Sequence, residues 1–450
     1  MKILVIKNST LIGSLLEDKN GISFEYSPEV SKSDYLIGIK EIKSLSKELF
    51  PVFENLLPEH EQLELIKTKY QIKGTIGSLL YLDNIHGSFE FYTEENFKEY
   101  SSVSNEVFNF LDVRECILEQ DYSFPNILDD YTLDIDKHKI LPIGLHGSKA
   151  IGISGYQYKF SISIDKDTKI ISHNENENGD YIMKPYNADN LKYSKDASSS
   201  YIPHLLVNEH IFMTFARDLG FSIPYNGIIK YGDDYLYVIK RFDRYNDSKI
   251  DHHEILTLIG KKSSEKYNIT TVEAMEEAAQ YLSQDEMAEL FKFFVFSIII
   301  AHGDLHAKNI SLIYKSNALS EKNMTLSPYY DISTVRFYKD ITPNDIGMTV
   351  KNKKSKIKEE DLLWLANKFQ IQEEIAKGYI EDIGLKFINT FETYIEKLPG
   401  EIKALKIMTN NYGYSKPFEE TLRTYYRQRV EYLSKYMNIV PIEVTTSIWE

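Results

Sequence analysis

Apolar and polar residues alternate over short segments at the start of the chain, and this period of two is typical of half-buried β-strands. Residues 3–6 and 22–26 show the alternation, and Asn, Gly and Ser residues that favour turns separate them. Residues 44–66 instead place apolar side chains three and four positions apart, as an amphipathic helix does. The first part of the chain is therefore predicted to be a mixed module of strands and helices.

A second group of strands is predicted after about residue 140, where glycine becomes frequent. Strands are expected at residues 159–165 and 180–186, and a helix at residues 205–219. Residues 228–244 have the pattern of a β-hairpin that turns at Gly232. Beyond about residue 250 the spacing of apolar residues is mostly helical.

These patterns predict an α+β protein with a β-rich lobe and a helical lobe. We divide the chain into an N-terminal module (residues 1–135), a β-rich lobe (residues 136–245) and a mostly helical lobe (residues 246–450). A ligand is expected in the cleft between the two lobes, because binding sites in such proteins commonly lie there.

Composition and charge narrow the classes of function. Of the 450 residues 42% are hydrophobic and 26% are charged, as in an ordinary folded soluble protein. The 52 Lys and Arg residues against 67 Asp and Glu residues give a net charge of −15, which disfavours direct binding to nucleic acid or an anionic membrane. The one basic run, residues 351–358, is interpreted as the solvated end of a hairpin.

The single cysteine and the apolar runs indicate the cellular compartment in which the protein is expected. One cysteine, Cys116, excludes a disulfide scaffold and a zinc site made of thiolates, and we expect it to be a small core residue. The apolar run 293–301 is about half of the ~20 residues that a membrane span needs, so it is predicted to be a buried helix. The start of the chain lacks the apolar core of a signal peptide, and we expect a cytoplasmic protein.

The densest group of polar residues in an apolar context is HGDLHAKN, residues 302–309. Asp304 and Asn309 are five positions apart, the spacing of the kinase catalytic loop, and Asp331 follows in a second acidic loop. In phosphoryl transfer such residues accept the hydroxyl proton and hold magnesium. Two alternatives remain: Asp and Asn side chains also cap loops, and His302, Asp304 and His306 are candidate ligands of a metal-dependent hydrolase.

A second pair of candidates lies upstream. Lys184 ends an apolar strand, and Glu209 lies 25 residues later in a predicted helix. Kinases hold the lysine that grips the α- and β-phosphates with a glutamate from a helix. The structural alternatives are a lysine that reaches solvent and a glutamate that favours the positive end of a helix dipole.

Two further segments complete an order typical of kinases. The glycine-containing turn 152–159 would present backbone N–H groups to phosphates, although it matches neither common phosphate-loop motif. Residues 238–244 would link the lobes and offer main-chain groups to an adenine ring. The sequence of turn, lysine, glutamate, linker, Asp304 with Asn309, and then Asp331 favours phosphoryl transfer over each alternative taken alone.

At these residues the chain resembles the HipA family of bacterial serine/threonine kinases, the toxin half of HipBA-type toxin–antitoxin pairs. The resemblance covers nearly the whole chain, and HGDLHAKN together with RFDR (residues 241–244) carries it most specifically. The other similar strings are ISGYQYKFS, NEHIFMTFARDLGFSIP, YVIKRFDR, LSPYYDIS and, in the N-terminal module, FENLLPEHEQLELI and LDNIHGSFEFY.

The resemblance implies a bilobed kinase-like fold with an extra N-terminal subdomain, the use of magnesium and ATP, and phosphorylation of a protein serine or threonine. It further implies a small DNA-binding antitoxin with a helix-turn-helix as partner, so that contact with DNA is indirect. Targets known in the family are aminoacyl-tRNA synthetases, whose inactivation stops translation and growth.

The resemblance also assigns roles by position. Asp304 is the implied catalytic base, Asn309 and Asp331 the magnesium ligands, and Glu209 the partner of Lys184. The residues that it places around ATP are Ser154, Gly155, Tyr156, Gln157, Tyr158, Lys159, Lys184, Lys240, Arg241, Phe242, His306, Lys308, Asn309 and Tyr330.

One position departs from the family pattern. The serine that the family usually phosphorylates on itself is replaced by Gly152, and Ser154 is the nearest substitute. We expect Ser154 to be the site of autophosphorylation, because a phosphate there would compete with ATP for the same backbone groups.

Two rival hypotheses differ in class from an active kinase. The first is a catalytically inactive kinase-like subunit that binds or represses, and the second is the metal-dependent hydrolase. The presence of Lys184, Asp304, Asn309 and Asp331 argues against the first, and the lack of further His and Asp clusters argues against the second.

Overall fold

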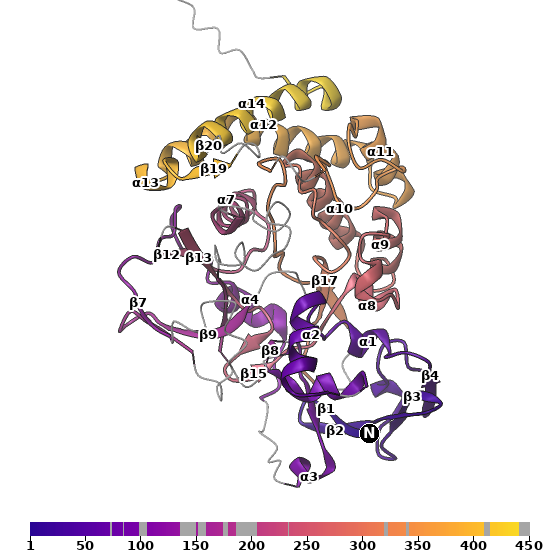
Figure 1. Ribbon diagram of the computed structural model, residues 1–450. Helices are drawn as coiled ribbons and strands as arrows, with labels where there is room; N and C mark the ends of the chain where they lie inside the picture. Colours follow the sequence, from indigo (N-terminus) through magenta and orange to yellow (C-terminus); the bar gives the residue numbers. More distant parts are fainter. Residues whose placement is uncertain are drawn as a thin grey trace, which may run out of the picture.

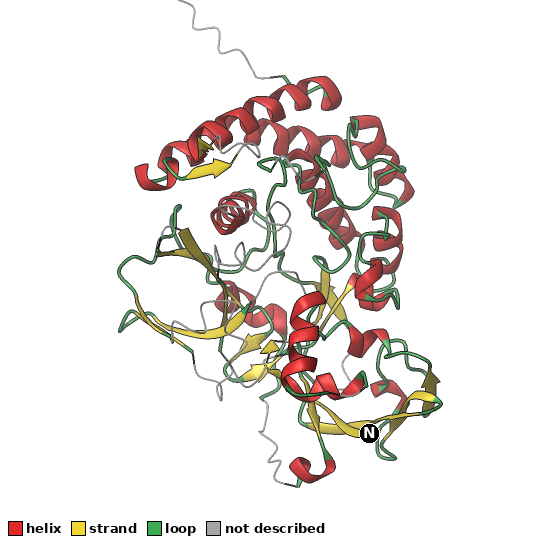
Figure 2. Ribbon diagram, in the orientation of Figure 1, coloured by secondary structure: helices red, strands yellow, loops and turns green. Residues whose placement is uncertain are grey.

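The computed structural model shows three groups of elements that surround the candidate site. Figure 1 shows an N-terminal module of strands and short helices, a β-rich lobe and a larger helical lobe, and Figure 2 shows how strands gather in the first two and helices in the third. The structure describes residues 1–72, 74–83, 85–98, 106–135, 150–151, 159–173, 179–185, 205–232, 234–318, 323–338, 342–408 and 415–440.

The N-terminal module is built on a five-stranded antiparallel sheet of order β4-β3-β2-β1-β6. One face of the sheet packs around the fully buried rings of Phe24 and Phe53, which explains the alternation of apolar residues along the strands. The elements are β1 (Lys2–Lys7), β2 (Thr10–Asp18), β3 (Gly21–Tyr26), β4 (Lys43–Ser46), α1 (Pro51–Glu54), α2 (His60–Lys69), β5 (Leu82–Asp83), β6 (Phe89–Tyr92), α3 (Glu94–Phe97) and α4 (Phe110–Leu118).

The prediction of a helical segment over residues 44–66 is wrong for its first residues. Strand β4 occupies Lys43–Ser46 and pairs with β3 at the edge of the sheet. Helix α1 begins only at Pro51, because proline fits the first helical position, whose N–H has no partner within the helix. Spacing alone could not separate a four-residue edge strand from the helix that follows it.

The β-rich lobe is a six-stranded sheet of order β12-β13-β11-β9-β10-β7. The hairpin of β12 and β13 and helix α7 form where the sequence predicts them, and α7 packs against both strands of the hairpin. The elements are β7 (Thr132–Asp134), β8 (Ala150–Ile151), β9 (Phe160–Asp165), β10 (Ile170–Ser172), β11 (Tyr181–Lys184), α7 (Leu205–Asp218), β12 (Asn226–Tyr231) and β13 (Asp234–Lys240).

The helical lobe packs around α10, whose C-terminal half is the predicted buried apolar run. Ser283 and Glu286 form a capping box that starts α10, and the side chains from Phe293 to Ile299 are fully buried. The helices are α8 (Ile255–Leu258), α9 (Thr271–Ala278), α10 (Gln284–Ile299), α11 (Glu359–Lys368), α12 (Glu373–Lys397), α13 (Gly400–Lys403) and α14 (Phe418–Met437). The short strands are β14 (Arg244–Tyr245), β15 (Ser248–Lys249), β16 (His252–Glu254), β17 (Ser311–Tyr314), β18 (Met324–Leu326), β19 (Lys406–Met408) and β20 (Ser415–Pro417).

None of the helices in the described part of the chain combines the length and the apolar run that crossing a membrane requires.

Cys116 is exposed, so the prediction that it is a core residue is wrong. Helix α4 turns Phe110, Ile117 and Leu118 toward the core. Cys116 lies six positions after Phe110, which at 3.6 residues per turn places it about 120° around the helix from Phe110 and outside the buried face. Because Cys116 is followed by the apolar residues Ile117 and Leu118, the sequence did not indicate that its side chain is exposed.

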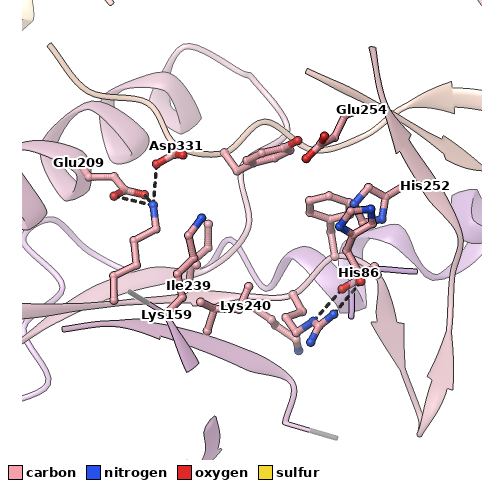
Figure 3. A pocket seen from close by; sticks show the side chains of 14 residues that line it. His86, Lys159, Glu209, Ile239, Lys240, His252, Glu254 and Asp331 are labelled. Carbon is pink, nitrogen blue, oxygen red and sulfur yellow. Dashed lines mark hydrogen bonds and ion pairs between the residues drawn. The ribbon is translucent and has the colours of Figure 1, made fainter. Parts of the chain in front are cut away.

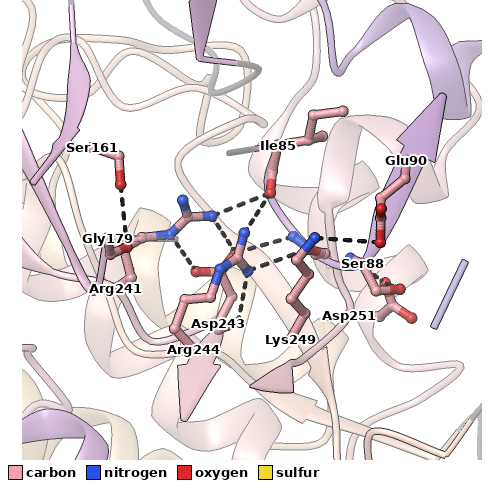
Figure 4. Close-up of polar contacts among 11 residues, drawn as sticks. Ile85, Ser88, Glu90, Ser161, Gly179, Arg241, Asp243, Arg244, Lys249 and Asp251 are labelled. Carbon is pink, nitrogen blue, oxygen red and sulfur yellow. Dashed lines mark hydrogen bonds and ion pairs between the residues drawn. The ribbon is translucent and has the colours of Figure 1, made fainter. Parts of the chain in front are cut away.

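A buried group of charges joins the N-terminal module to the connection between the lobes (Figure 4). The Asp243 carboxylate accepts hydrogen bonds from Arg241 and Arg244, each at 2.9 Å, and Arg244 also donates to the backbone oxygen of Ile85 at 2.8 Å. Burial would raise the pKa of Asp243, but the two arginines outweigh it and hold that pKa well below its ordinary value. Asp243 is therefore the anion that lets two arginines be buried together.

We predict that Asp243→Asn destabilises the protein by about 3 to 5 kcal/mol, because the substitution leaves two buried guanidinium groups without their counter-charge. Unfolding in urea, followed by fluorescence, measures the loss. Glu25→Gln is the matched control, since Glu25 forms an exposed pair with Lys43 and should leave stability unchanged. Equal midpoints for Asp243→Asn and the wild-type chain would contradict this account.

Candidate active site

Three charged side chains from distant parts of the chain meet at one end of a pocket. Lys184 ends strand β11, Glu209 lies in the second turn of α7, and Asp331 lies in the loop after β18. The Nζ atom of Lys184 lies 2.7 Å and 2.9 Å from the two carboxylate oxygens of Glu209 and 2.6 Å from Oδ1 of Asp331. Figure 3 shows both carboxylates at the same end of the pocket.

The alternation of side chains along β11 explains why Lys184 faces this pocket. Tyr181 and Met183 point into the apolar core of the β-rich lobe, whereas Ile182 and Lys184 line the pocket on the other face. The Lys184 side chain is only 5% exposed, which excludes the alternative of a lysine that reaches solvent. Lys184 and Glu209 therefore form a buried ion pair.

The charged side chains of this group shift one another's pKa values. Burial would lower the pKa of Lys184, but Asp331 and Glu209 outweigh it and raise that pKa. Burial would raise the pKa of Asp331, but Lys184 and Lys159 hold it far below its ordinary value. Burial raises the pKa of Glu209 to about 7 and lowers the pKa of Lys159 to about 8. At neutral pH Lys184 is thus a cation and Asp331 an anion.

The loop that contains Asp304 follows α10 and passes close to a neighbouring segment. Gly303 has no room for a side chain, since an added Cβ atom would lie 2.4 Å from Cγ2 of Val335 and 3.0 Å from the backbone oxygen of Asn344. Glycine is therefore required directly before Asp304.

Asn309 and Asp331, which the sequence predicts to be metal ligands, lie next to each other. Nδ2 of Asn309 donates to Oδ2 of Asp331 at 3.2 Å, and Oδ1 of Asn309 accepts a hydrogen bond from the backbone N–H of His306 at 3.1 Å. Asp331 adopts a left-handed backbone conformation with φ of 61°, which aspartate tolerates better than most residues. Carboxylate and amide oxygens are donors that suit Mg²⁺, so both residues fit that ion by chemical type, and Asn309 would have to turn its amide group to offer its oxygen on the side of Asp331.

Asp304 is an exposed residue that does not itself line this pocket, and it receives one strong hydrogen bond. The Tyr267 hydroxyl donates to Oδ1 of Asp304 at 2.6 Å. The surrounding protein desolvates the carboxyl group on most sides and raises its pKa to about 6, although the residue keeps contact with solvent. A carboxylate with this pKa is suited to accept a proton near neutral pH.

The middle of the pocket is flat and apolar. Phe242 and Tyr330 face each other with ring centroids 5.7 Å apart and an angle of 28° between their planes, and Ile182 and Ile239 line the same space. Planar aromatic rings and branched side chains of this kind suit a flat heterocycle such as a nucleobase.

The polar ends of two linker residues point away from this space. Lys240 pairs with Glu119, and the Arg241 guanidinium binds Asp243 and the backbone oxygen of Ile85. Both residues line the pocket, so what they offer a ligand there is main chain and aliphatic stem.

Lys308 and His306 lie in the same loop as Asp304 but do not line this pocket. The Lys308 side chain is fully buried, and its Nζ atom lies 2.6 Å from Oγ of Ser263 and 3.4 Å from Oε1 of Glu59. Glu59 belongs to the N-terminal module, so Lys308 ties that module to the loop that contains Asp304.

Of the loop that is expected to cover the phosphates, the structure describes only the last residue, Lys159. Ser154, Gly155, Tyr156, Gln157 and Tyr158 lie outside the described residues, as does Gly152. Lys159 is described, and it lies in the pocket near Lys184 and Asp331.

Two histidines that the sequence analysis did not single out line the end of the pocket opposite Asp331 (Figure 3). His86 comes from the N-terminal module and His252 from β16, and their rings lie 4.8 Å apart. The string LDNIHGSFEFY contains His86 as a part of the N-terminal module, but no local spacing shows that a residue so far upstream reaches the pocket.

The alternative of a metal-dependent hydrolase gains no support from this geometry. Within the ranges given above, His, Cys, Asp and Glu side chains do not assemble into any group of three or more suited to hold a metal ion. His302 and His306 are both buried, whereas Asp304 is exposed.

Two domain families match the chain. The HipA N-terminal domain matches residues 3–84, and the HipA-like C-terminal domain matches residues 151–391, more than half of the 450 residues. The chain belongs to the HipA family. This confirms the resemblance that the motifs indicate.

Two of the proteins that the chain resembles come from bacteria. A protein of Haemophilus influenzae, named as a candidate kinase, is 25% identical over 322 residues, which covers 67% of this chain and 87% of that protein. The serine/threonine-protein kinase toxin HipA of Shewanella oneidensis is 23% identical over 159 residues, which covers 30% of this chain and 36% of that protein.

A solved structure shows the same fold. HipA of Shewanella oneidensis MR-1, determined in a complex with HipB and its operator DNA, aligns with a TM-score of 0.64 over 96% of this chain and 97% of that chain, at 14% identity. The likeness confirms the α+β, kinase-like architecture that the sequence predicts.

We predict that Lys308→Met lowers the free energy of unfolding by about 1 to 3 kcal/mol, because the buried Glu59 loses one of its two counter-charges and keeps only Lys266. Urea unfolding measures the change, and Lys386→Met on the exposed face of α12 is the control. A variant with wild-type stability but weakened ATP binding would instead show that Lys308 acts directly on the phosphates.

Proposed function

We propose that this chain is a protein kinase that uses magnesium and ATP to phosphorylate a serine or threonine of another protein. The observation that carries the proposal is the Lys184 amine held between Glu209 and Asp331, with Asn309 next to Asp331. A buried cation beside an ionised carboxylate is the arrangement that kinases use to hold the phosphates of ATP and their metal.

The described residues suit distinct roles in this reaction. Lys184 would contact the α- and β-phosphates, with Glu209 holding it in place, and Asn309 and Asp331 would hold magnesium, which neutralises phosphate charge. The nucleobase would lie against the apolar part of the pocket that Ile182, Ile239, Phe242 and Tyr330 line.

Asp304 would accept the proton of the substrate hydroxyl. As the hydroxyl oxygen forms its bond to the γ-phosphorus, the bond from that phosphorus to the bridging oxygen of ADP breaks, and the proton moves to the Asp304 carboxylate. The raised pKa of Asp304 supports this role, since a carboxylate with a pKa of about 6 is a better base than an ordinary aspartate.

The proposal also gives each part of the chain a role. Residues 1–135 would act as the N-terminal subdomain, residues 136–245 as the kinase N-lobe and residues 246–450 as the kinase C-lobe. Strand β7 (Thr132–Asp134) belongs to the sheet of the N-lobe, so the first boundary would lie just before it. The loop from Ser154 to Lys159 would cover the phosphates, and a phosphate on Ser154 would switch the kinase off.

Relatives suggest the biological setting. HipA of Shewanella oneidensis is named a kinase toxin and forms a complex with HipB and operator DNA. We therefore propose a HipB-like antitoxin as partner of this chain, whose net charge of −15 suits a basic partner that contacts DNA itself. The protein substrate would belong to the translation machinery, with an aminoacyl-tRNA synthetase as the first candidate.

We predict that Asp304→Asn folds and binds ATP but loses phosphate transfer by about 10²- to 10⁴-fold, because the amide cannot accept the proton. Transfer from radiolabelled ATP to the proteins of a bacterial extract, and to the chain itself, measures the loss. Asp382→Asn on α12 is the control, since Asp382 forms an exposed pair with Lys386.

The pH dependence of the wild-type chain tests the same role of Asp304. Because the base must be ionised, the wild-type kcat/KM should fall about tenfold for each pH unit below about 6 and level off above it. A wild-type chain that transfers no phosphate would favour the inactive kinase-like subunit, and wild-type rates in Asp304→Asn would exclude Asp304 as the base.

A further inference from the structure

The Tyr267 hydroxyl directly contacts Asp304, the proposed catalytic base. Tyr267 follows a short turn at Ser263–Glu265 and precedes α9, and its hydroxyl donates to Oδ1 of Asp304 at 2.6 Å. Within the described part of the chain, no other side chain or backbone group forms a hydrogen bond with the Asp304 carboxylate. Oδ1 is thus engaged, and Oδ2 is available to a substrate hydroxyl.

The segment that contains Tyr267 is anchored, although the Tyr267 residue itself is 44% exposed. The neighbouring Lys266 is buried and lies 2.6 Å from Oε2 of Glu59. The Ser263 backbone N–H donates to Oε2 of Glu54 at 3.1 Å. The segment is therefore held by the N-terminal module on one side and contacts the base on the other.

The ring of Tyr267 is also restrained. It meets the ring of His306 edge to face, with centroids 5.0 Å apart, and the Lys266 ammonium lies 5.3 Å from its centroid. His306 belongs to the same loop as Asp304, so ring and hydroxyl both fix Tyr267 against that loop. An aspartate whose one oxygen is held in this way has less freedom to turn away from a substrate.

We propose that Tyr267 is a positioning residue, whose hydroxyl holds one oxygen of Asp304 and so directs the other toward the substrate hydroxyl. The proposal rests on the proposed function, in which Asp304 is the base. Orientation of a catalytic group matters because small displacements from the reactive geometry cost large factors in rate.

Removing the hydroxyl should have two separate effects. The Asp304 carboxylate would gain freedom, so kcat should fall about 10- to 100-fold while KM for ATP stays unchanged. The acid limb of the pH profile should move to higher pH, because the hydrogen bond from Tyr267 favours the ionised form of Asp304. Lys266 also favours that form, whereas Asp331 and Glu59 oppose it, and all three remain in the variant.

The test compares Tyr267→Phe with Tyr92→Phe in the full chain. Tyr92 is a matched control, since its hydroxyl also donates to a carboxylate, that of Glu90 at 2.8 Å, in the N-terminal module. Phosphate transfer from radiolabelled ATP to the proteins of a bacterial extract is measured between about pH 5 and pH 8. A lower kcat with a shifted acid limb in Tyr267→Phe, and neither change in Tyr92→Phe, is the expected result.

Two results would overturn the proposal. Unchanged rate and pH profile in Tyr267→Phe would show that the contact has no role in the reaction. A faster rate with a lower KM for the protein substrate would show that Tyr267 blocks the base rather than directing it. Asp304→Asn measured alongside separates the hypotheses: wild-type rates in that variant refute the base itself, whereas an inactive Asp304→Asn with an unaltered Tyr267→Phe refutes only the role of Tyr267.

Discussion

The buried ammonium group of Lys184 is the constraint on which the arrangement of the lobes depends. A charge of this kind is costly to remove from water unless oppositely charged groups surround it. Its two partners come from outside its own strand, Glu209 from α7 and Asp331 from the loop after β18. The ion pairs of Lys184 with both carboxylates therefore require strand β11, helix α7 and the helical lobe to meet at one place. The pocket lies at the same place.

A second set of buried charges extends this dependence to the N-terminal module. Glu59 lies beside both Lys266 and Lys308, and Lys308 belongs to the loop of Asp304 and Asn309. The loop is thus held at two points, by Asp331 at its end and by Glu59 through Lys308. These contacts hold the N-terminal module against the loop. The hydrogen bonds of Arg241 and Arg244 to the backbone oxygen of Ile85 hold the module near His86, which lines the pocket.

Much of the fold and of the site could be predicted because the signals are local. The hairpin of β12 and β13, helix α7 and the buried end of α10 follow from the spacing of apolar residues, and the HGDLHAKN motif places Asp304 and Asn309 in one loop. What could not be predicted depends on contacts between distant segments. The spacing of residues along the sequence does not indicate the hydrogen bond of Tyr267 to Asp304 or the burial of Lys308 against Glu59. The exposure of Cys116 depends on which side of α4 packs against the core.

The most direct test of the central claim is a crystal structure of the full chain with magnesium and a non-hydrolysable ATP analogue. The account predicts phosphates at the Lys184 amine, which keeps its contact with Glu209, and a magnesium ion bound by Asp331 and Asn309. It also predicts the nucleobase against the apolar lining of the pocket that includes Phe242 and Tyr330. A nucleotide bound elsewhere, with Lys184 still paired to Asp331 and no metal at Asn309, would contradict the account.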